Sequence, residues 1–181
     1  KIPSQNTELG FYYSFSYGGV KFIMLNTNET GGRLSDGQYS WLENELKNKT
    51  EKWTIVSMHN PMYSVGKWGS DPEKNSLTLA YQSQLKGLFA EYKVDIVLQG
   101  HDHMVSRTHP IKADGNASEE NVENGYVVNP DGVIYVMNGP AGDQEKGRTS
   151  IYPHDEGLYA YAEGSSASSW AEFEVSGDSI K

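Results

Sequence analysis

Three histidines follow two short apolar segments of the chain. His59 comes directly after residues 53–58, and His101 and His103 lie in a Gly-His-Asp-His sequence directly after residues 94–99. Apolar segments of this length, rich in β-branched residues, indicate buried strands rather than helices. Neutral imidazole is the commonest protein ligand for zinc, iron and related metals. We therefore predict a metal site built from these three side chains; the alternative is that each is an ordinary polar residue in a turn.

The elements around these histidines are expected to bring them together. Residues 76–92 have a helix-like pattern with an apolar stripe and lie between the two predicted strands. A strand, a helix and a strand in this order form a βαβ unit with parallel strands and a right-handed crossover. Because the C-terminal ends of parallel strands share one edge of a sheet, His59, His101 and His103 should meet there, where open α/β sheets bind ligands.

The rest of the chain predicts further strands and one more helix. Residues 11–17 and 20–26 indicate a hairpin, and residues 36–47 a helix with Ser35 or Asp36 as its N-cap. The second half predicts a strand at 104–109, an exposed polar excursion at 112–124, a hairpin of 126–128 with 133–137 around 129–132, a polar loop at 142–153, and antiparallel strands at 157–163 and 169–175.

Two of these segments resemble the last two metal-binding blocks of the calcineurin-like metallophosphoesterases, in particular the purple acid phosphatase-like branch. The segments are Met58-His59-Asn60-Pro61-Met62-Tyr63-Ser64 and residues 94–110, which contain Gly100-His101-Asp102-His103. Weaker similarity at 13–27, 38–46 and 132–142 extends the resemblance over nearly the whole chain. It implies an α/β (α+β) fold, part of the αββα sandwich of this family, with a mixed β-sheet flanked by helices.

The same resemblance implies a metal-dependent phosphoesterase, an acid phosphatase-like hydrolase that cleaves phosphate esters. Two divalent or trivalent ions, of iron, zinc or manganese, would activate a hydroxide and stabilise the transferring phosphoryl group. All three histidines would be catalytic metal ligands: His59 and His101 on one ion and His103 on the other. The choice between monoesters, diesters and nucleotides stays open, and so does the identity of the metals.

Three sequence blocks that the resemblance leads one to expect are not in place. The family's catalytic domain opens with Asp-x-His, Gly-Asp and Gly-Asn-His blocks, and none occurs where it should in this chain. Residues 1–181 are therefore expected to form a single domain that is the C-terminal portion of such a catalytic domain. Its partner would be the missing N-terminal half, and the chain alone would hold at most one metal, weakly, and be inactive. The alternative is a non-catalytic metal-binding or structural module.

Other side chains near these blocks are weaker candidates. Tyr63 and Arg107 are possible substrate-binding residues, since an aromatic ring can wall a site and a guanidinium can bind a phosphate bidentately. Core packing is the alternative for Tyr63, as it is for Trp68, and an ion pair within the sheet is the alternative for Arg107. Asp102 either orients one of its neighbouring ligands or, as is expected for a turn residue, faces solvent.

Composition limits the classes of partner. The net charge of −9 argues against nucleic acid binding, but not against a phosphate ester, because bound cations can dominate the local charge. There is no cysteine, and no apolar run approaches the roughly 18 residues that span a bilayer, so no membrane partner is expected. Sequons begin at Asn28, Asn48 and Asn116, but sequons are common by chance and carry glycans only in a eukaryotic secretory protein. The frequent export of the resembling branch favours an extracellular or cell-surface protein. An uncovered sheet face would favour a homodimer, strand exchange or attachment to the rest of the domain.

Overall fold

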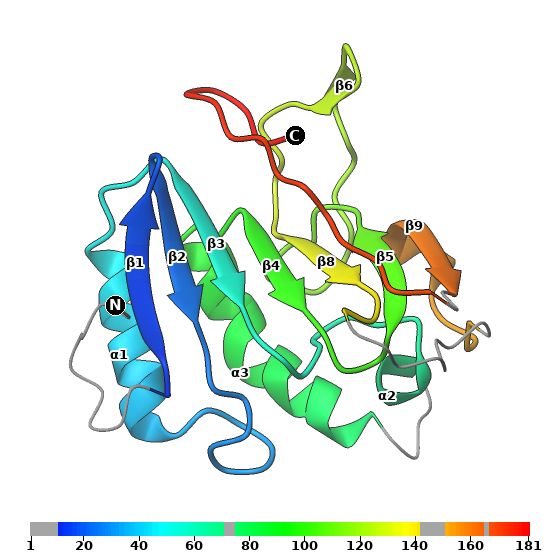
Figure 1. Ribbon diagram of the computed structural model, residues 1–181, viewed down its shortest axis with the longest axis horizontal. Helices are drawn as coiled ribbons and strands as arrows, with labels where there is room; N and C mark the ends of the chain where they lie inside the picture. The colour runs from blue at the N-terminus through cyan, green and yellow to red at the C-terminus, as the bar shows by residue number, and fades with distance from the viewer. Residues whose placement is uncertain (1–10, 71–74, 142–150, 165–166) are drawn as a thin grey trace.

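A computed structural model describes residues 11–70, 75–141, 151–164 and 167–181. Its centre is a seven-stranded mixed sheet in the order β1-β2-β3-β4-β8-β5-β9, and β6 and β7 form a separate two-stranded ribbon (Figure 1). The strands are β1 (Tyr13–Tyr17), β2 (Val20–Met24), β3 (Trp53–Ser57), β4 (Ile96–Gln99), β5 (Met104–Thr108), β6 (Val122–Glu123), β7 (Tyr126–Val127), β8 (Ile134–Asn138) and β9 (Tyr159–Gly164). The helices are α1 (Asp36–Lys47), α2 (Lys67–Ser70) and α3 (Ser76–Glu91), with a 3₁₀ turn at Glu156–Leu158.

The middle of the sheet is parallel, as the sequence predicted for its two histidine-bearing strands. β2, β3, β4 and β8 are consecutive parallel neighbours, so their C-terminal ends lie at one edge. β1 and β5 pair antiparallel with β2 and β8, and β9 continues the sheet beyond β5. This arrangement confirms a mixed α/β sheet and places the residues after β3 and β4 side by side.

The long helices α1 and α3 cover one face of the sheet (Figure 1). α1 spans the predicted residues, and its N-cap is Ser35, whose hydroxyl accepts the backbone N–H of Gln38 at 3.2 Å. Such a cap satisfies one of the free donors of the first helical turn. The main core lies between this helix layer and the sheet, and its members share full or nearly full burial: Ile23, Val56 and Val97 from the sheet, and Leu42, Leu46, Leu85 and Phe89 from the helices.

The opposite face of the sheet is covered only in part. Val20, Ile55 and Ile96 form a small second core against Phe173, Val175 and Ile180 of the C-terminal segment, which crosses in front of the sheet in Figure 1. Two polar contacts fix that segment: Lys52 pairs with Asp178 at 2.5 Å, and the Trp53 indole donates to the carbonyl of Ser176 at 3.3 Å. The described residues thus form one helix layer and one sheet layer of the expected αββα sandwich.

The hairpin predicted around residues 129–132 is wrong. β7 pairs with β6, around Asn124 and Gly125, which have φ values of 53° and 82°. β8 instead enters the main sheet between β4 and β5. The Asn-Gly dipeptide is a strong signal for a two-residue turn, and here it determines the pairing.

The strand pair predicted at 157–163 and 169–175 is half right. The first segment forms β9, which pairs with β5, whereas the second makes only an isolated bridge between Val175 and Ile180. Part of the polar loop predicted at 142–153, namely 142–150, lies outside the described residues. No described helix is long and apolar enough to cross a membrane.

Candidate metal centre

His59 and His101 meet at the C-terminal edge of β3 and β4. Two backbone hydrogen bonds extend the parallel pairing past the strand ends, from Met58 N–H to the carbonyl of Leu98 at 3.0 Å and from Gly100 N–H to the carbonyl of His59 at 3.1 Å. Nε2 of His59 and Nδ1 of His101 are 3.1 Å apart, and the two rings lie edge to face with their centroids at 5.1 Å.

The distance between these nitrogens fits two ligands of one ion. Nitrogens that each lie roughly 2.0–2.1 Å from a shared ion are about 3.3 Å apart in a tetrahedral arrangement and about 2.9 Å apart as neighbours in an octahedral one. The observed 3.1 Å lies between these values and also suits a hydrogen bond between two neutral imidazoles. The distance by itself therefore fits either two ligands of one ion or a hydrogen bond between the two rings.

His103 is the third predicted ligand. It is half-buried, and both His101 and His103 have positive φ values, 74° and 54°, which histidine tolerates better than most residues do. Within the described ranges, no group of three His, Cys, Asp or Glu side chains is arranged to hold a metal ion. The structure thus brings two of the three predicted ligands together, and the ligand roles of all three remain a prediction.

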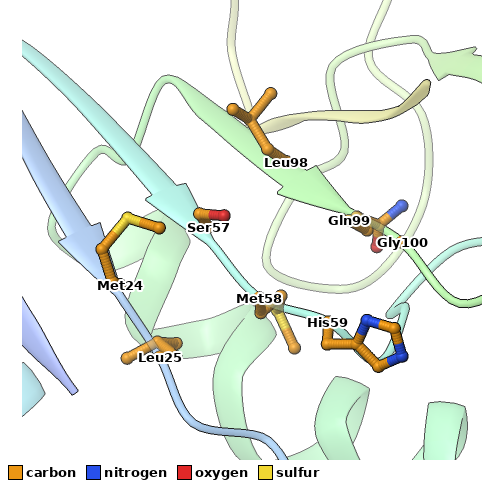
Figure 2. A pocket seen from close by; sticks show the side chains of 8 residues that line it. All are labelled: Met24, Leu25, Ser57, Met58, His59, Leu98, Gln99 and Gly100. Carbon is orange, nitrogen blue, oxygen red and sulfur yellow. The ribbon is translucent and has the colours of Figure 1, made fainter. Parts of the chain in front are cut away.

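An open pocket of about 320 Å³ lies beside His59. Its lining comes from the C-terminal ends of β2, β3 and β4 and the residues after them: Met24, Leu25, Ser57, Met58, His59, Leu98, Gln99 and Gly100. Figure 2 shows the His59 ring at one end of this pocket and apolar side chains from the strands along it. The pocket gives room beside His59 for groups from another polypeptide segment or for a small ligand.

The prediction that Asp102 faces solvent is wrong. Its side chain is fully buried, and its Oδ2 accepts hydrogen bonds from the Ser64 hydroxyl at 2.6 Å and from the Trp68 backbone N–H at 3.0 Å. Burial of a carboxylate is costly unless such donors compensate it. The ring of Trp68 lies 5.3 Å from that of His101, centroid to centroid.

Two polar side chains that the sequence analysis overlooked fix the loop after His59. The buried Gln99 accepts the backbone N–H groups of Met62 and Tyr63 at 2.7 and 3.1 Å, and its amide donates to the Tyr63 carbonyl at 2.7 Å. Thr27, which follows β2, accepts the Asn60 N–H on its hydroxyl at 3.1 Å. For Gln99, the available signal was a polar residue at the end of an apolar strand, two residues before the predicted ligand His101.

Both weaker substrate-binding candidates have other partners. The side chain of Tyr63 is nearly buried and packs against Tyr135 at 4.5 Å, and burial raises the pKa of Tyr63 to about 12, so core packing accounts for it. Arg107 lies 3.6 Å from the carboxylate of Glu120, which also accepts a hydrogen bond from Nδ1 of His109 at 2.9 Å. Arg107 thus has an ion pair, as its alternative proposed, but the partner lies in the segment between β5 and β6 and not within the sheet.

The chain is thus an α/β protein with histidines at the C-terminal ends of two adjacent parallel strands. This edge of the sheet is where proteins of this class bind their ligands. The sequence profile of the family described as calcineurin-like phosphoesterase matches residues 2–105, which include His59, His101 and His103. The chain therefore belongs to the calcineurin-like phosphoesterase family.

Several relatives of the chain are named purple acid phosphatases. Purple acid phosphatase 23 of Arabidopsis thaliana is 32% identical over 149 residues, which are 75% of this chain and 26% of that protein. A second Arabidopsis protein, named "probable inactive purple acid phosphatase 27", is 30% identical over 84% of this chain and 25% of its own length. The solved structure of a purple acid phosphatase from yellow lupin seeds has the same fold, with a TM-score of 0.62 at 24% identity, over 84% of this chain and 26% of that chain. The chain thus spans about a quarter of the length of these relatives.

Proposed function

We propose that this chain contributes one side of the metal centre of a phosphoesterase that hydrolyses phosphate esters. His59 and His101 would hold one ion, and His103 would belong to a second ion site. The observation that supports this most directly is the 3.1 Å between Nε2 of His59 and Nδ1 of His101. Family membership supports the class of reaction, and the phosphatase names of the relatives support an acid phosphatase-like activity.

The described residues would hold a metal ion in place and would not neutralise its charge. Metal ions in such a centre lower the pKa of bound water and stabilise the charge on phosphoryl oxygens. Neutral imidazoles of His59 and His101 would fix an ion without reducing its charge. Asn60 anchors the backbone beside His59, because its N–H and its side-chain amide both donate to Thr27, each at 3.1 Å. The ion would be iron, zinc or manganese, which imidazole nitrogen suits.

We further propose that the remaining ligands, including a bridging carboxylate, come from a part of the protein outside these 181 residues. Residues 1–181 would be a C-terminal portion of the catalytic domain. Two observations support this: two histidines alone leave an ion incompletely coordinated, and the pocket beside His59 is open to further groups. The chain alone would then hold at most one ion, weakly.

The decisive experiment compares the chain with the complete protein. The complete protein should hydrolyse p-nitrophenyl phosphate or its bis-ester in a metal-dependent manner, and His101→Ala should reduce the rate by at least about a hundredfold, since the metal clamp supplies most of the transition-state stabilisation. The isolated chain should be no faster than its own His101→Ala variant. His109→Ala is the matched control, because His109 follows β5 at the opposite edge of the sheet and bonds to Glu120.

Two results would contradict the proposal: metal-dependent turnover by the isolated chain that requires His101, or undiminished activity of the complete protein with His101→Ala. A non-catalytic metal-binding or structural module is the second candidate. The convergence of only two candidate ligands in the described residues favours it, and so does similarity to a relative that is named inactive. Metal binding by the complete protein without turnover of either ester would establish that second candidate.

An extracellular or cell-surface location is part of the same proposal. The side chains of Asn28, Asn48 and Asn116, which begin the three sequons, are all exposed and can accept a glycan. Expression through a eukaryotic secretory pathway should yield a product whose mobility changes after glycosidase treatment.

A further inference from the structure

Asp102 is the one fully buried residue in the turn that bears His101 and His103. The flanking histidines both have left-handed backbone conformations, with φ values of 74° and 54°. Such conformations persist only where the surrounding structure fixes them. The contacts of the intervening carboxylate therefore bear on how the turn is held.

The loop after β3 encloses this carboxylate. Besides the bonds from the Ser64 hydroxyl and the Trp68 N–H, the Gly66 N–H donates to the Ser64 oxygen at 3.0 Å. Gly66 itself lies against the carboxylate: a Cβ at this position would be 2.5 Å from Cγ of Asp102. The carboxylate thus joins the loop that follows His59 to the turn that contains His101.

Trp68 is held from two sides. Its N–H donates to Asp102, and its carbonyl accepts the hydroxyl of Thr78 on α3 at 2.9 Å. Its half-buried ring is tilted by 56° against the ring of His101, at 5.3 Å between centroids. The bonds to Asp102 therefore determine where an aromatic ring lies relative to a candidate metal ligand.

We propose that Asp102 is a positioning residue that fixes the Trp68 ring against His101, so that Trp68 walls one side of the candidate metal centre. Through Trp68, Asp102 limits the motion of the His101 ring and the size of the groups that approach it. The claim that Asp102 fixes the Trp68 ring against His101 does not depend on a metal. The claim that Trp68 walls a metal centre rests on the proposed function.

Nuclear magnetic resonance of the His101 ring protons tests the structural part without any metal. The Trp68 ring current shifts these signals, and Trp68→Leu gives their position without it. Ser64→Ala and Asp102→Ala should move the signals most of the way to that position, while Asp102→Asn, which keeps one acceptor oxygen, should move them less. Ser14→Ala is the matched control, because Ser14 is another buried serine that donates to a carboxylate, that of Glu45 at 2.5 Å.

If Asp102 only stabilises the fold, Ser64→Ala and Ser14→Ala should both lower the thermal stability, and neither should move the His101 signals. That result would overturn the proposal. Ser64→Ala and Asp102→Asn remain decisive where Asp102→Ala does not fold, because each removes only part of the bonding.

Zinc titration of the same variants tests the part about the ion. Outer-shell partners typically change metal affinity by about 10–100-fold, so Ser64→Ala should weaken zinc binding by at least about tenfold and Ser14→Ala should not. Unchanged zinc affinity in Ser64→Ala would overturn this part. Failure of the unmodified chain and of the complete protein to bind zinc, iron or manganese would instead contradict the proposed function, and the magnetic resonance result would be unaffected.

Discussion

His59 and His101 are placed by the backbone that carries them. The backbone hydrogen bonds of Met58 to Leu98 and of Gly100 to His59 continue the parallel pairing beyond β3 and β4. The two segments that follow these strands therefore leave the sheet at the same level. Side chains that leave a shared edge at the same level point into the same space. The facing nitrogens of the two rings follow from this register.

Removal of either histidine should weaken metal binding by the chain. We expect His59→Ala and His101→Ala each to lower zinc or manganese affinity by at least about tenfold, because loss of a ligand costs no less than loss of an outer-shell partner. The double variant should be little worse than either single one, since residues that share one partner are not additive. Isothermal titration calorimetry measures all three, with His109→Ala as the control. Additive losses would show that the two rings do not bind the same ion.

The sequence predicted the meeting of His59 and His101 from two features. The apolar pattern and length of two segments identified them as strands, and the strand–helix–strand order made these strands parallel, so that they end at the same edge. The sequence did not predict the burial of Asp102, because the groups that bury it, Ser64 and Gly66, lie far away in the sequence. A turn sequence by itself suggests exposure. Only the folded arrangement of two loops shows that this carboxylate has enough donors to be buried.

At the scale of elements, the first half of the chain was more predictable than the second. The hairpin of β1 and β2, the helix α1 and the βαβ unit of β3, α3 and β4 all join neighbours in sequence. β8 was assigned to the wrong partner because its actual neighbours, β4 and β5, precede it by a long connection. Local pattern identifies a strand such as β8 but does not select its partner.

Two glycines in different elements should respond oppositely to alanine. Gly87 lies exposed within α3, where an added Cβ meets no atom within 4 Å, so Gly87→Ala should stabilise the fold by about 0.5–1 kcal/mol. Gly132 has a φ of 144°, and a Cβ there would be 2.7 Å from the backbone of Ile111, so Gly132→Ala should destabilise by more than about 1 kcal/mol. Urea denaturation measures both; equal effects would contradict this account of the two backbone environments.

At the scale of the whole molecule, the two faces of the sheet differ. α1 and α3 pack against one face, whereas the other face is covered in part by the C-terminal segment. Phe15 and Phe22 stack at 4.9 Å on that second face and remain half-exposed. Parallel strands are normally covered on both faces, so this surface should be covered in the complete protein by the rest of the domain.

The isolated chain should therefore self-associate through the second face. Sedimentation equilibrium should show dimers or larger species for the unmodified chain, and Phe22→Lys should shift it toward monomer by placing a charge among the exposed apolar groups. Leu79→Lys is the control, because Leu79 is 52% exposed on α3 at the helix layer. A stable, well-folded monomer of the unmodified chain at high concentration would contradict this expectation.

The place of β8 in the sheet also constrains how the chain folds as it is synthesised. β4 and β5 are separated only by residues 100–103, so a local antiparallel hairpin of these two strands is the first pairing open to the edge of β4 that faces away from β3. In the folded protein β8, residues 134–138, lies between them. Until β8 emerges, the open edge of β4 is exposed to incorrect pairing with β5 or with another chain. The turn that bears His101 and His103 therefore reaches its final form only after a strand made much later has separated the two strands beside it.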